Sequence, residues 1–410
     1  MLNVIIKIVN YSITPFQIRE RYAIIIHILP SVCLENIVPC IFGFIQTPDE
    51  RSENDKDRIS MKTTKIKRTL SAALLIAMLF SLTACGSTPY DYDLDEYIKF
   101  GDYTKISISA GVAMEYMEKS KQELINSHAT PSAPITDRNL KVGDIAVVSY
   151  KCYTEEIYNS QNKGTAAPVL EDTDCHIVLG RGKYPAALES AILATPPSTA
   201  TPTEVRVALP ANYGITSLAG QNVVFIFTVS YAYSLTLPEF NDEFVSTHTP
   251  YPTVAEYERA VTEQGFYQAV WDELVEISQM VSYPASELNE HTLDFIEYYT
   301  NLAVEEELTL ESYIKRKFFI ELSAFHIKAD EFAKAYTKEE TMVYCLSRSN
   351  GLELTDNEYE ERAQKYVVMY GYESLSALER DFSPSFVRYT VLKDKVMEFV
   401  ADNSFTEWEV

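Results

Sequence analysis

The chain has 410 residues, of which 46% are hydrophobic, and its formal net charge is −24 at pH 7. This length allows two or three domains with buried cores, and 28 Tyr and 19 Phe argue against disorder over most of it. The acidic balance without a basic stripe argues against a nucleic-acid-binding protein, and six cysteines are too few for a disulfide scaffold.

An export signal is predicted at residues 61–84. Basic residues gather at 62–68, a short apolar stretch covers 70–82, and small residues precede Cys85. This order resembles a bacterial lipoprotein signal, in which the cysteine thiol receives lipid and becomes the new N-terminus. The alternative is a plain transmembrane helix, but the apolar stretch is shorter than the roughly 20 residues that a span needs. We therefore expect a lipid on Cys85 that holds the protein on the outer face of the cytoplasmic membrane, at the cell surface.

Residues 1–60 form a doubtful extension in front of this signal. Their apolar stretch, 22–45, is interrupted by Pro30, Glu35 and Pro39, which a clean membrane span would not tolerate. We predict that translation starts at Met61. If the extension is translated, the apolar stretch at 70–82 becomes internal, and a signal-anchor helix replaces the lipid anchor.

The segment after the signal divides into a tether and a lead-in. Residues 85–100 are polar, acidic and rich in Tyr, which is typical of a tether. The lead-in, 101–138, contains a candidate strand at 104–109 and a helix at 113–127 with apolar residues at helical spacing.

Residues 139–237 are rich in β-forming residues. Four runs read as strands, at 145–150, 175–179, 204–209 and 223–231, and 184–193 reads as one short helix. Several antiparallel strands around one helix indicate an α+β domain.

Residues 238–410 have a helical pattern. Thr253 with Glu256, and Thr355 with Glu358, form capping boxes, and Ser383 precedes a proline at a helix start. The apolar faces of these helices have two interpretations: they form the core of a bundle, or they form an open cradle that binds unfolded segments.

Three motifs in the strand-rich part carry a family resemblance. They are Leu140-Lys141-Val142-Gly143-Asp144 with Val147-Val148-Ser149-Tyr150, then Ile177 to Pro185 with Leu188-Glu189, then Leu209 to Gly214 with Val224 to Val229. In order and spacing they resemble an FKBP-type prolyl isomerase domain. Leu218-Ala219-Gly220 and the stretch 237–244 resemble the trigger factor branch, and 271–284 and 368–403 resemble its C-terminal helical chaperone domain.

The resemblance covers roughly residues 139–410 and implies both fold and activity. The fold is α+β: an FKBP-like antiparallel sheet wrapped on one short helix, followed by an all-α, trigger factor C-terminal-like domain. The activity is peptidyl-prolyl cis/trans isomerisation, which needs neither a metal nor a cofactor. An apolar bowl lowers the barrier of roughly 18–20 kcal/mol that the partial double bond of the amide imposes.

The resemblance also implies the residues of this bowl. Tyr150 and Phe225 line it, Tyr184 and Pro185 form its lip, Leu188 forms its floor, Tyr213 offers a hydroxyl to the substrate carbonyl, and Val169, Leu170, Glu171 and Phe227 add contacts to the substrate. Plain core packing is the alternative for each of them.

The chain departs from the family at the floor of the bowl. Leu188 replaces an aromatic residue there, and Ala187 replaces a glycine. Weak catalysis, or binding without catalysis, would follow from these changes, so a chaperone with a degenerate isomerase domain is the alternative function. An open bowl in the structure would favour catalysis, and a filled bowl would not. A surface receptor is a third hypothesis, supported by the predicted location alone.

The expected partners are unfolded or newly exported polypeptides and, through Cys85, a membrane. We expect no ribosome partner, because nothing before residue 139 resembles the Gly-Phe-Arg loop of the trigger factor docking domain. The histidines lack the spacing of metal ligands. Cys152 and Cys175 fall on strands that could be neighbours, which leaves open whether a disulfide joins them.

Overall fold

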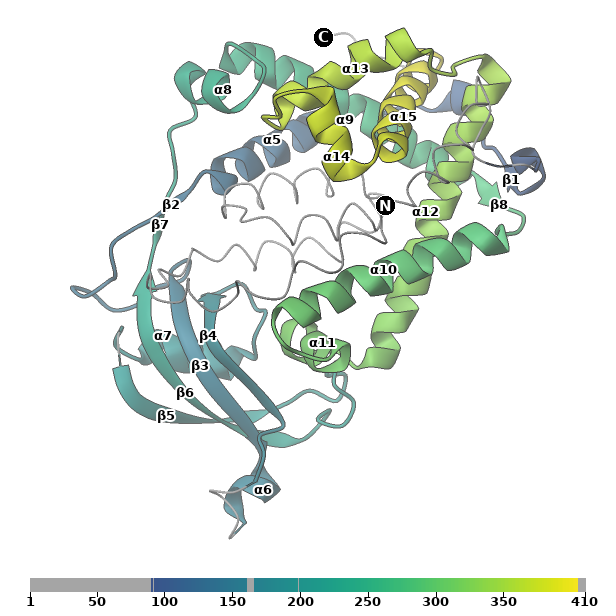
Figure 1. The fold of residues 1–410 in the computed structure, drawn as a ribbon. Helices are drawn as coiled ribbons and strands as arrows, with labels where there is room; N and C mark the ends of the chain where they lie inside the picture. Colours follow the sequence, from purple (N-terminus) through teal and green to yellow (C-terminus); the bar gives the residue numbers. More distant parts are fainter. Residues whose placement is uncertain (1–89, 91, 161–165, 198, 405–410) are drawn as a thin grey trace, which may run out of the picture.

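The computed structural model describes residues 90, 92–160, 166–197 and 199–404. The doubtful extension 1–60, the signal 61–84 and Cys85 therefore lie outside the described residues. The described chain forms an antiparallel sheet domain and a helical body. Figure 1 shows the sheet domain below the helical body.

The sheet domain contains one four-stranded antiparallel sheet in the order β4-β3-β6-β5. Its strands are β3 (Ile145–Thr154), β4 (Leu170–Val178), β5 (Thr199–Ala208) and β6 (Asn222–Tyr233). The short helix α7 (Ala186–Ala194) packs on the inner face, and α6 (Glu155–Asn159) follows β3. This arrangement confirms the predicted α+β class with strands around one helix.

Alternating apolar residues give the sheet its inner face. In β3, Val148, Tyr150 and Cys152 point into the core, and Phe225 and Phe227 of β6 meet them there. Successive side chains of a strand point to opposite faces, so this spacing of two places all five on one side.

A buried ion pair stabilises the entry to the sheet domain. Asp144 is fully buried, and Arg138 donates to both of its carboxylate oxygens, at 2.6 and 2.8 Å. The Lys141 backbone N–H donates to the same carboxylate at 2.9 Å. These donors, above all Arg138, lower the pKa of Asp144 below its usual range despite burial.

Two chain crossings connect the sheet domain to the helical body. The ribbon of β2 (Thr130–Pro131) and β7 (Leu235–Thr236) is antiparallel and forms a neck (Figure 1). The sheet domain is thus inserted into the helical body, because the helix before the neck, residues 110–127, packs against the helix 254–277 after it. Gly265 allows this close approach, since a Cβ at that position would lie 2.8 Å from Tyr116.

The helical body consists mainly of nine described helices. They are α5 (Ala110–Ser127), α8 (Asp242–His248), α9 (Val254–Ile277), α10 (Ala285–Glu305), α11 (Leu310–Phe318), α12 (Leu322–Asn350), α13 (Asp356–Met369), α14 (Leu375–Phe382) and α15 (Pro384–Asp402). The predicted caps are present: Thr253, Thr355 and Ser383 each accept from a backbone N–H three residues later.

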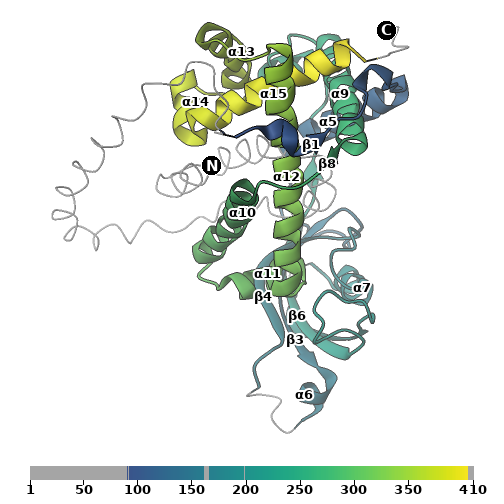
Figure 2. The ribbon, with the colours of Figure 1, turned by 90° about the vertical axis from the view of Figure 1, so that its right-hand side faces the viewer.

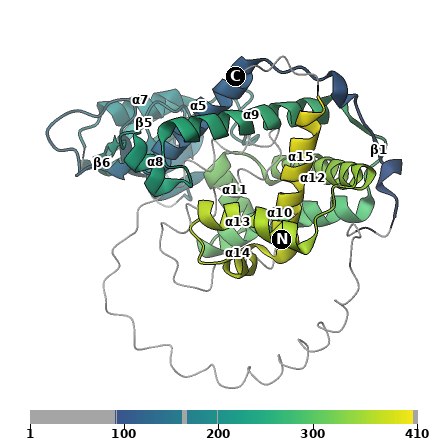
Figure 3. The same ribbon diagram turned by 90° about the horizontal axis from the view of Figure 1, so that it is seen from above.

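The helices separate into an upper bundle and an arm. The helix α9 crosses the top of the molecule towards α12, α15 and β1 (Figure 3). The helices α10, α11 and α12 form the arm, which descends until α11 lies beside β4 of the sheet domain (Figures 1 and 2). None of the described helices is long and apolar enough to span a membrane.

The described part of the predicted tether is packed on the helical body. Leu94 of the short helix η2 (Leu94–Glu96) is 1% exposed, and β1 (Ile98–Lys99) pairs with β8 (Gln279–Met280). Arg348 of α12 contacts Asp93 and Asp95 at 2.6 and 2.7 Å. These contacts correct the prediction of a tether up to residue 100. The predicted strand at 104–109 is also absent, because Tyr103–Lys105 forms a 3-10 turn, η3.

Candidate functional site

The predicted bowl residues meet on the inner face of the sheet. Tyr150 of β3 lies beside Phe225 of β6, with ring centroids 5.7 Å apart, and beside Tyr184, at 6.1 Å. Leu188 of α7 belongs to the same core cluster and is completely buried. The sequence therefore brings together the wall, floor and lip residues that it predicted.

The lip is held by a carboxylate that the sequence analysis did not single out as functional. Glu189 is buried and accepts from the backbone N–H groups of Gly180, at 2.9 Å, and Tyr184, at 3.2 Å. Pro185 directly follows Tyr184 and is the N-cap of α7, and its carbonyl accepts from the Leu188 N–H at 2.9 Å. These bonds fix the lip and the floor relative to each other.

Tyr213 lies at the edge of the bowl on a turn between β5 and β6. Its backbone N–H donates to the Pro210 carbonyl at 3.0 Å, and the Gly220 N–H donates to the same oxygen. The ring is half-buried against the sheet core. Burial raises the pKa of Tyr213 to about 12, so its hydroxyl stays protonated and can donate a hydrogen bond at neutral pH.

Tyr150 carries a buried hydroxyl without a hydrogen-bond partner among the described residues. The residue is 2% exposed, and burial raises its pKa well above the usual value. An unsatisfied buried hydroxyl costs roughly 1–3 kcal/mol. The Tyr370 and Tyr389 hydroxyls of the helical body are also buried without a partner among the described residues, so this feature is not confined to the bowl.

Among the residues predicted to add substrate contacts, one faces outward and one is buried too deeply to reach a substrate. Val169 is half-buried at the edge of the core and Leu170 is buried within it. Glu171 is exposed on the outer face, because side chains alternate along β4. Phe227 is 1% exposed and lies deep in the core, directly opposite Tyr150 in the register. Glu171 and Phe227 are therefore not at the rim.

The acid that does face inward is Asp172, which the sequence analysis missed. It is buried and stands opposite Tyr150 in the pairing of β3 with β4. Burial raises the pKa of its carboxyl, while nearby Lys317 and Arg316 oppose that rise. The available signal was its spacing of two from Leu170, which places both side chains on the same face.

The helical body also contributes to the site, which no motif indicated. Phe319, at the end of α11, contacts Tyr184 edge to face with ring centroids 5.2 Å apart. Arg316 of α11 approaches Asp172 at 3.5 Å. The bowl is consequently filled by its own aromatic rings and covered by Phe319.

A hollow of about 250 Å³ lies next to the covered bowl. Its lining comes from both parts of the molecule: Thr154, Val169, Ile215, Ser217 and Leu218 of the sheet domain and Lys315 of the arm. Apolar side chains with a few polar groups at the rim are typical of a site that binds a peptide or small molecule.

The two cysteines of the sheet are free. Cys175 stands opposite Val148 and Cys152 stands opposite Leu170, so the two thiols lie several ladder steps apart. The Cys175 thiol donates to the Val148 carbonyl at 2.8 Å. Burial raises the pKa of each thiol to about 12, which makes both unreactive. The disulfide that the sequence left open is therefore not formed.

No group of three or more metal-ligating side chains occurs in the part of the chain that the structure describes. The rings of His128 and His248 lie close together, tilted, with centroids 3.8 Å apart, and Phe244 packs against both of them.

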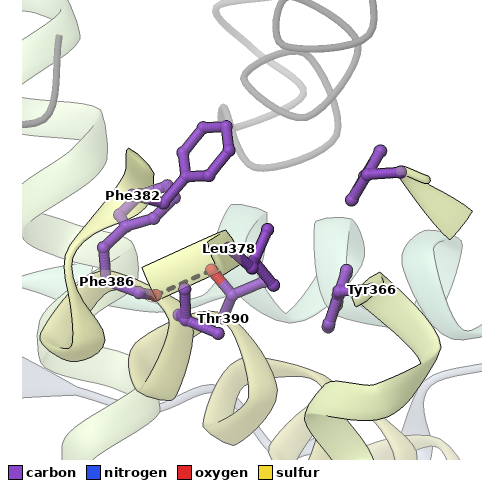
Figure 4. A pocket seen from close by; sticks show the side chains of 7 residues that line it. Tyr366, Leu378, Phe382, Phe386 and Thr390 are labelled. Carbon is purple, nitrogen blue, oxygen red and sulfur yellow. Dashed lines mark hydrogen bonds between the residues drawn. The ribbon is translucent and has the colours of Figure 1, made fainter. Parts of the chain in front are cut away.

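A second hollow lies among α13, α14 and α15 (Figure 4). Tyr366, Leu378, Phe382 and Phe386 line it, and the Thr390 hydroxyl donates to the Phe386 carbonyl at 2.9 Å. Its volume of about 10 Å³ is enough for roughly one water molecule, so it is a packing defect.

Comparison with known proteins gives a consistent set of relatives. No family model matches the chain. The trigger factor of Clostridium kluyveri is 22% identical over 332 residues, which cover 75% of this chain and 72% of that protein. The trigger factor of Acetivibrio thermocellus is 22% identical over 86% of this chain and 80% of that protein.

Two further matches are more limited. The trigger factor of Rippkaea orientalis is 26% identical over 175 residues, and the match spans only 38% of that protein. A solved structure of the trigger factor chaperone, described for promiscuous substrate recognition in folding and assembly activities, is 18% identical over 74% of this chain. Its TM-score is 0.29, too low to support an argument about the arrangement of the parts.

Proposed function

Because the chain is a trigger factor-like protein, we propose that it is a folding factor that binds unfolded polypeptides and catalyses cis/trans isomerisation of their X-Pro bonds. The single observation that supports this proposal best is the aromatic group of Tyr150, Phe225 and Tyr184 on the inner face of the sheet, with the half-buried Tyr213 packed against it. Uncatalysed X-Pro isomerisation takes roughly tens to hundreds of seconds, which is slow enough to limit folding.

The bowl would act through its environment and through its hydroxyls. Rotation about the X-Pro bond breaks the amide resonance, so the transition state is less polar than the planar amide. Apolar walls of Tyr150, Phe225 and Leu188 would exclude water and favour that twisted form. A hydroxyl of Tyr213 or Tyr150, protonated at neutral pH, would donate to a substrate carbonyl and fix the substrate in place.

The helical body would hold the rest of the unfolded chain. Several large apolar side chains of its helices are exposed: Leu293 and Val304 of α10, Ile327 of α12 and Val368 of α13 are 54–65% exposed. Such side chains supply apolar contacts to an unfolded segment.

We also propose that the protein acts on exported chains, anchored by lipid on Cys85 to the outer face of the membrane, and without a ribosome partner. The lipoprotein-type signal at 61–84 supports the location. Co-sedimentation of the purified chain with ribosomes tests the last part, and a salt-resistant complex would contradict it.

Refolding of a model protein limited by proline isomerisation tests the enzyme. Tyr213→Phe removes one hydroxyl. If that hydroxyl binds the transition state, the variant should accelerate refolding about tenfold less than the unmodified chain does. The matched control is Tyr231→Phe, because Tyr231 is exposed and stacks with Tyr233 away from the bowl. No acceleration by the unmodified chain would refute catalysis.

A non-catalytic chaperone is the second candidate, and two observations favour it. The bowl is filled in this structure, and its floor is Leu188, where the family resemblance predicts an aromatic ring. Suppressed aggregation of an unfolded client without faster refolding would decide for this alternative.

A further inference from the structure

We propose that the end of the arm is a built-in plug of the isomerase bowl, so that substrate must displace it. The arm tip is defined as residues 319–321, between α11 and α12. This inference rests on the proposed isomerase function, and it assigns to the helical body the control of access to the bowl.

Phe319 occupies the place where an apolar substrate side chain would enter. Its ring contacts Tyr184 at the lip and packs against the core of the sheet domain, although the residue belongs to the helical body. Its backbone has φ 56° and ψ 36°, the left-handed conformation that bulky residues rarely adopt. The surroundings of the tip must therefore hold this strained geometry.

Gly214 shows how closely the tip approaches the turn that carries Tyr213. A Cβ at Gly214 would lie 2.3 Å from the Phe319 carbonyl oxygen and 3.0 Å from Ile320 Cγ2. Only glycine leaves room for the tip backbone at this point. The turn beside the bowl and the arm tip therefore fit each other at backbone level.

Polar contacts surround this apolar plug. Arg316 approaches the buried Asp172 at 3.5 Å, and the Ser217 hydroxyl lies 3.5 Å from Glu321 Oε1. Lys315 holds Glu321 at 3.1 Å. The two contacts of Glu321 are long or partly exposed, so each contributes little. The Arg316 contact ends on a buried carboxylate, and the Phe319 ring packs on the sheet core, so a bound substrate must offset the loss of both when the tip leaves.

Only molecules whose tip is open bind substrate at the bowl. The apparent affinity is therefore the intrinsic affinity multiplied by the open fraction. An unfolded chain that binds the exposed apolar side chains of the arm would shift this balance, provided that it binds the released arm better than the docked one. Capture of a client by the helical body would then open the isomerase bowl.

Two single substitutions, one from each side of the contact, test the plug in the full chain. Phe319→Ala removes the plugging ring, and Gly214→Ala pushes the tip away. Each should raise the isomerase rate on unfolded substrate on the order of tenfold if the bowl is mostly closed. Phe318→Ala is the matched control, because the neighbouring ring packs within the arm against Tyr299 and Tyr313. Gly111→Ala controls for the added methyl group, since only Ser109 Oγ, at 3.9 Å, lies near that position.

A cross-link gives a readout that does not depend on catalysis. The pair Ser217→Cys and Glu321→Cys places one thiol on each side of the contact, where the native hydroxyl and carboxylate lie 3.5 Å apart. A short reducible bis-methanethiosulfonate reagent should link them, because Glu321→Cys leaves a gap wider than a direct disulfide spans, and peptide mapping distinguishes this link from the native thiols. The cross-linked form should lose activity at least about tenfold relative to the reduced form, and a reductant should restore it.

The outcomes separate the plug from the function. If the reduced chain is active but no cross-link forms, or the cross-link leaves the rate unchanged, the plug is refuted and the isomerase stands. If the cross-link forms but neither the reduced chain nor Phe319→Ala isomerises substrate, the isomerase is refuted and the tip is ordinary packing.

Discussion

At the scale of single residues, the site depends on which side of a strand each side chain occupies. The resemblance named Tyr150, Leu188 and Phe225, and these three side chains share one cluster because their motifs are local and fall inside strands or a helix. It also named Glu171 of β4, which lies on the outer face, since a shift of one residue along a strand reverses the face. Asp172, not Glu171, faces Tyr150.

Asp172→Asn should change how stability depends on pH. The folded-state pKa of Asp172 is raised by burial, so the folded protein holds this proton more tightly than the unfolded chain does. The resulting stabilisation is complete below the ordinary carboxyl pKa near 3.9 and is lost as the pH rises through the raised folded value. The charged groups that face it are Arg316, Lys317 and Glu306.

Denaturant unfolding at several pH values measures this effect. In the unmodified chain, the free energy of unfolding should decrease as the pH rises above about 4, and Asp172→Asn should make this decrease smaller. At pH 7 we expect the variant to be at least as stable as the unmodified chain. Asp174→Asn is the control on the same strand, because Asp174 is exposed. A variant that is markedly less stable at pH 7 would show that the contact with Arg316 outweighs the cost of burial.

At the scale of elements, local patterns predicted the helix starts and the strands, but not which elements pack together. The four strand-like runs and the short helix became β3 to β6 and α7, because alternation and β-branched residues act locally. The arm tip on the bowl is a contact between parts about a hundred residues apart, and no local pattern encodes it. Lys393 shows the same limit: it is buried beside Glu339, which also accepts from Trp271, and no local pattern marks this lysine as buried.

Leu94→Ala tests whether the segment before α5 is structural. Leu94 belongs to the same buried cluster as Trp271 of α9 and Val396 of α15. Removing a buried leucine side chain costs roughly 2–5 kcal/mol. Thermal melting followed by helical circular dichroism should show this loss, whereas Leu237→Ala, at a half-exposed position beside the neck, should change little. Equal melting of the two variants would restore the interpretation of this segment as a tether.

At the scale of the whole molecule, packing of the chain from Tyr92 onward limits how far the body can lie from an anchor at Cys85. Seven residues span at most about 25 Å when fully extended. A lipid on Cys85 would therefore hold the helical body next to the membrane surface, and the sheet domain would hang from it through the β2–β7 neck.

Cys85→Ser should release the protein into the soluble fraction or leave its signal uncleaved, because the thiol that would carry the lipid is gone. Cys40→Ser is the matched control, since Cys40 lies in the doubtful extension and would be absent from a chain that starts at Met61. Fractionation of cells followed by mass spectrometry of the N-terminal peptide measures both the attachment and the start. If Cys85→Ser stays with the membrane while the extension is detected in the mature protein, a signal-anchor helix holds the chain. The segment between the membrane and the helical body would then be longer than the segment after a lipid on Cys85.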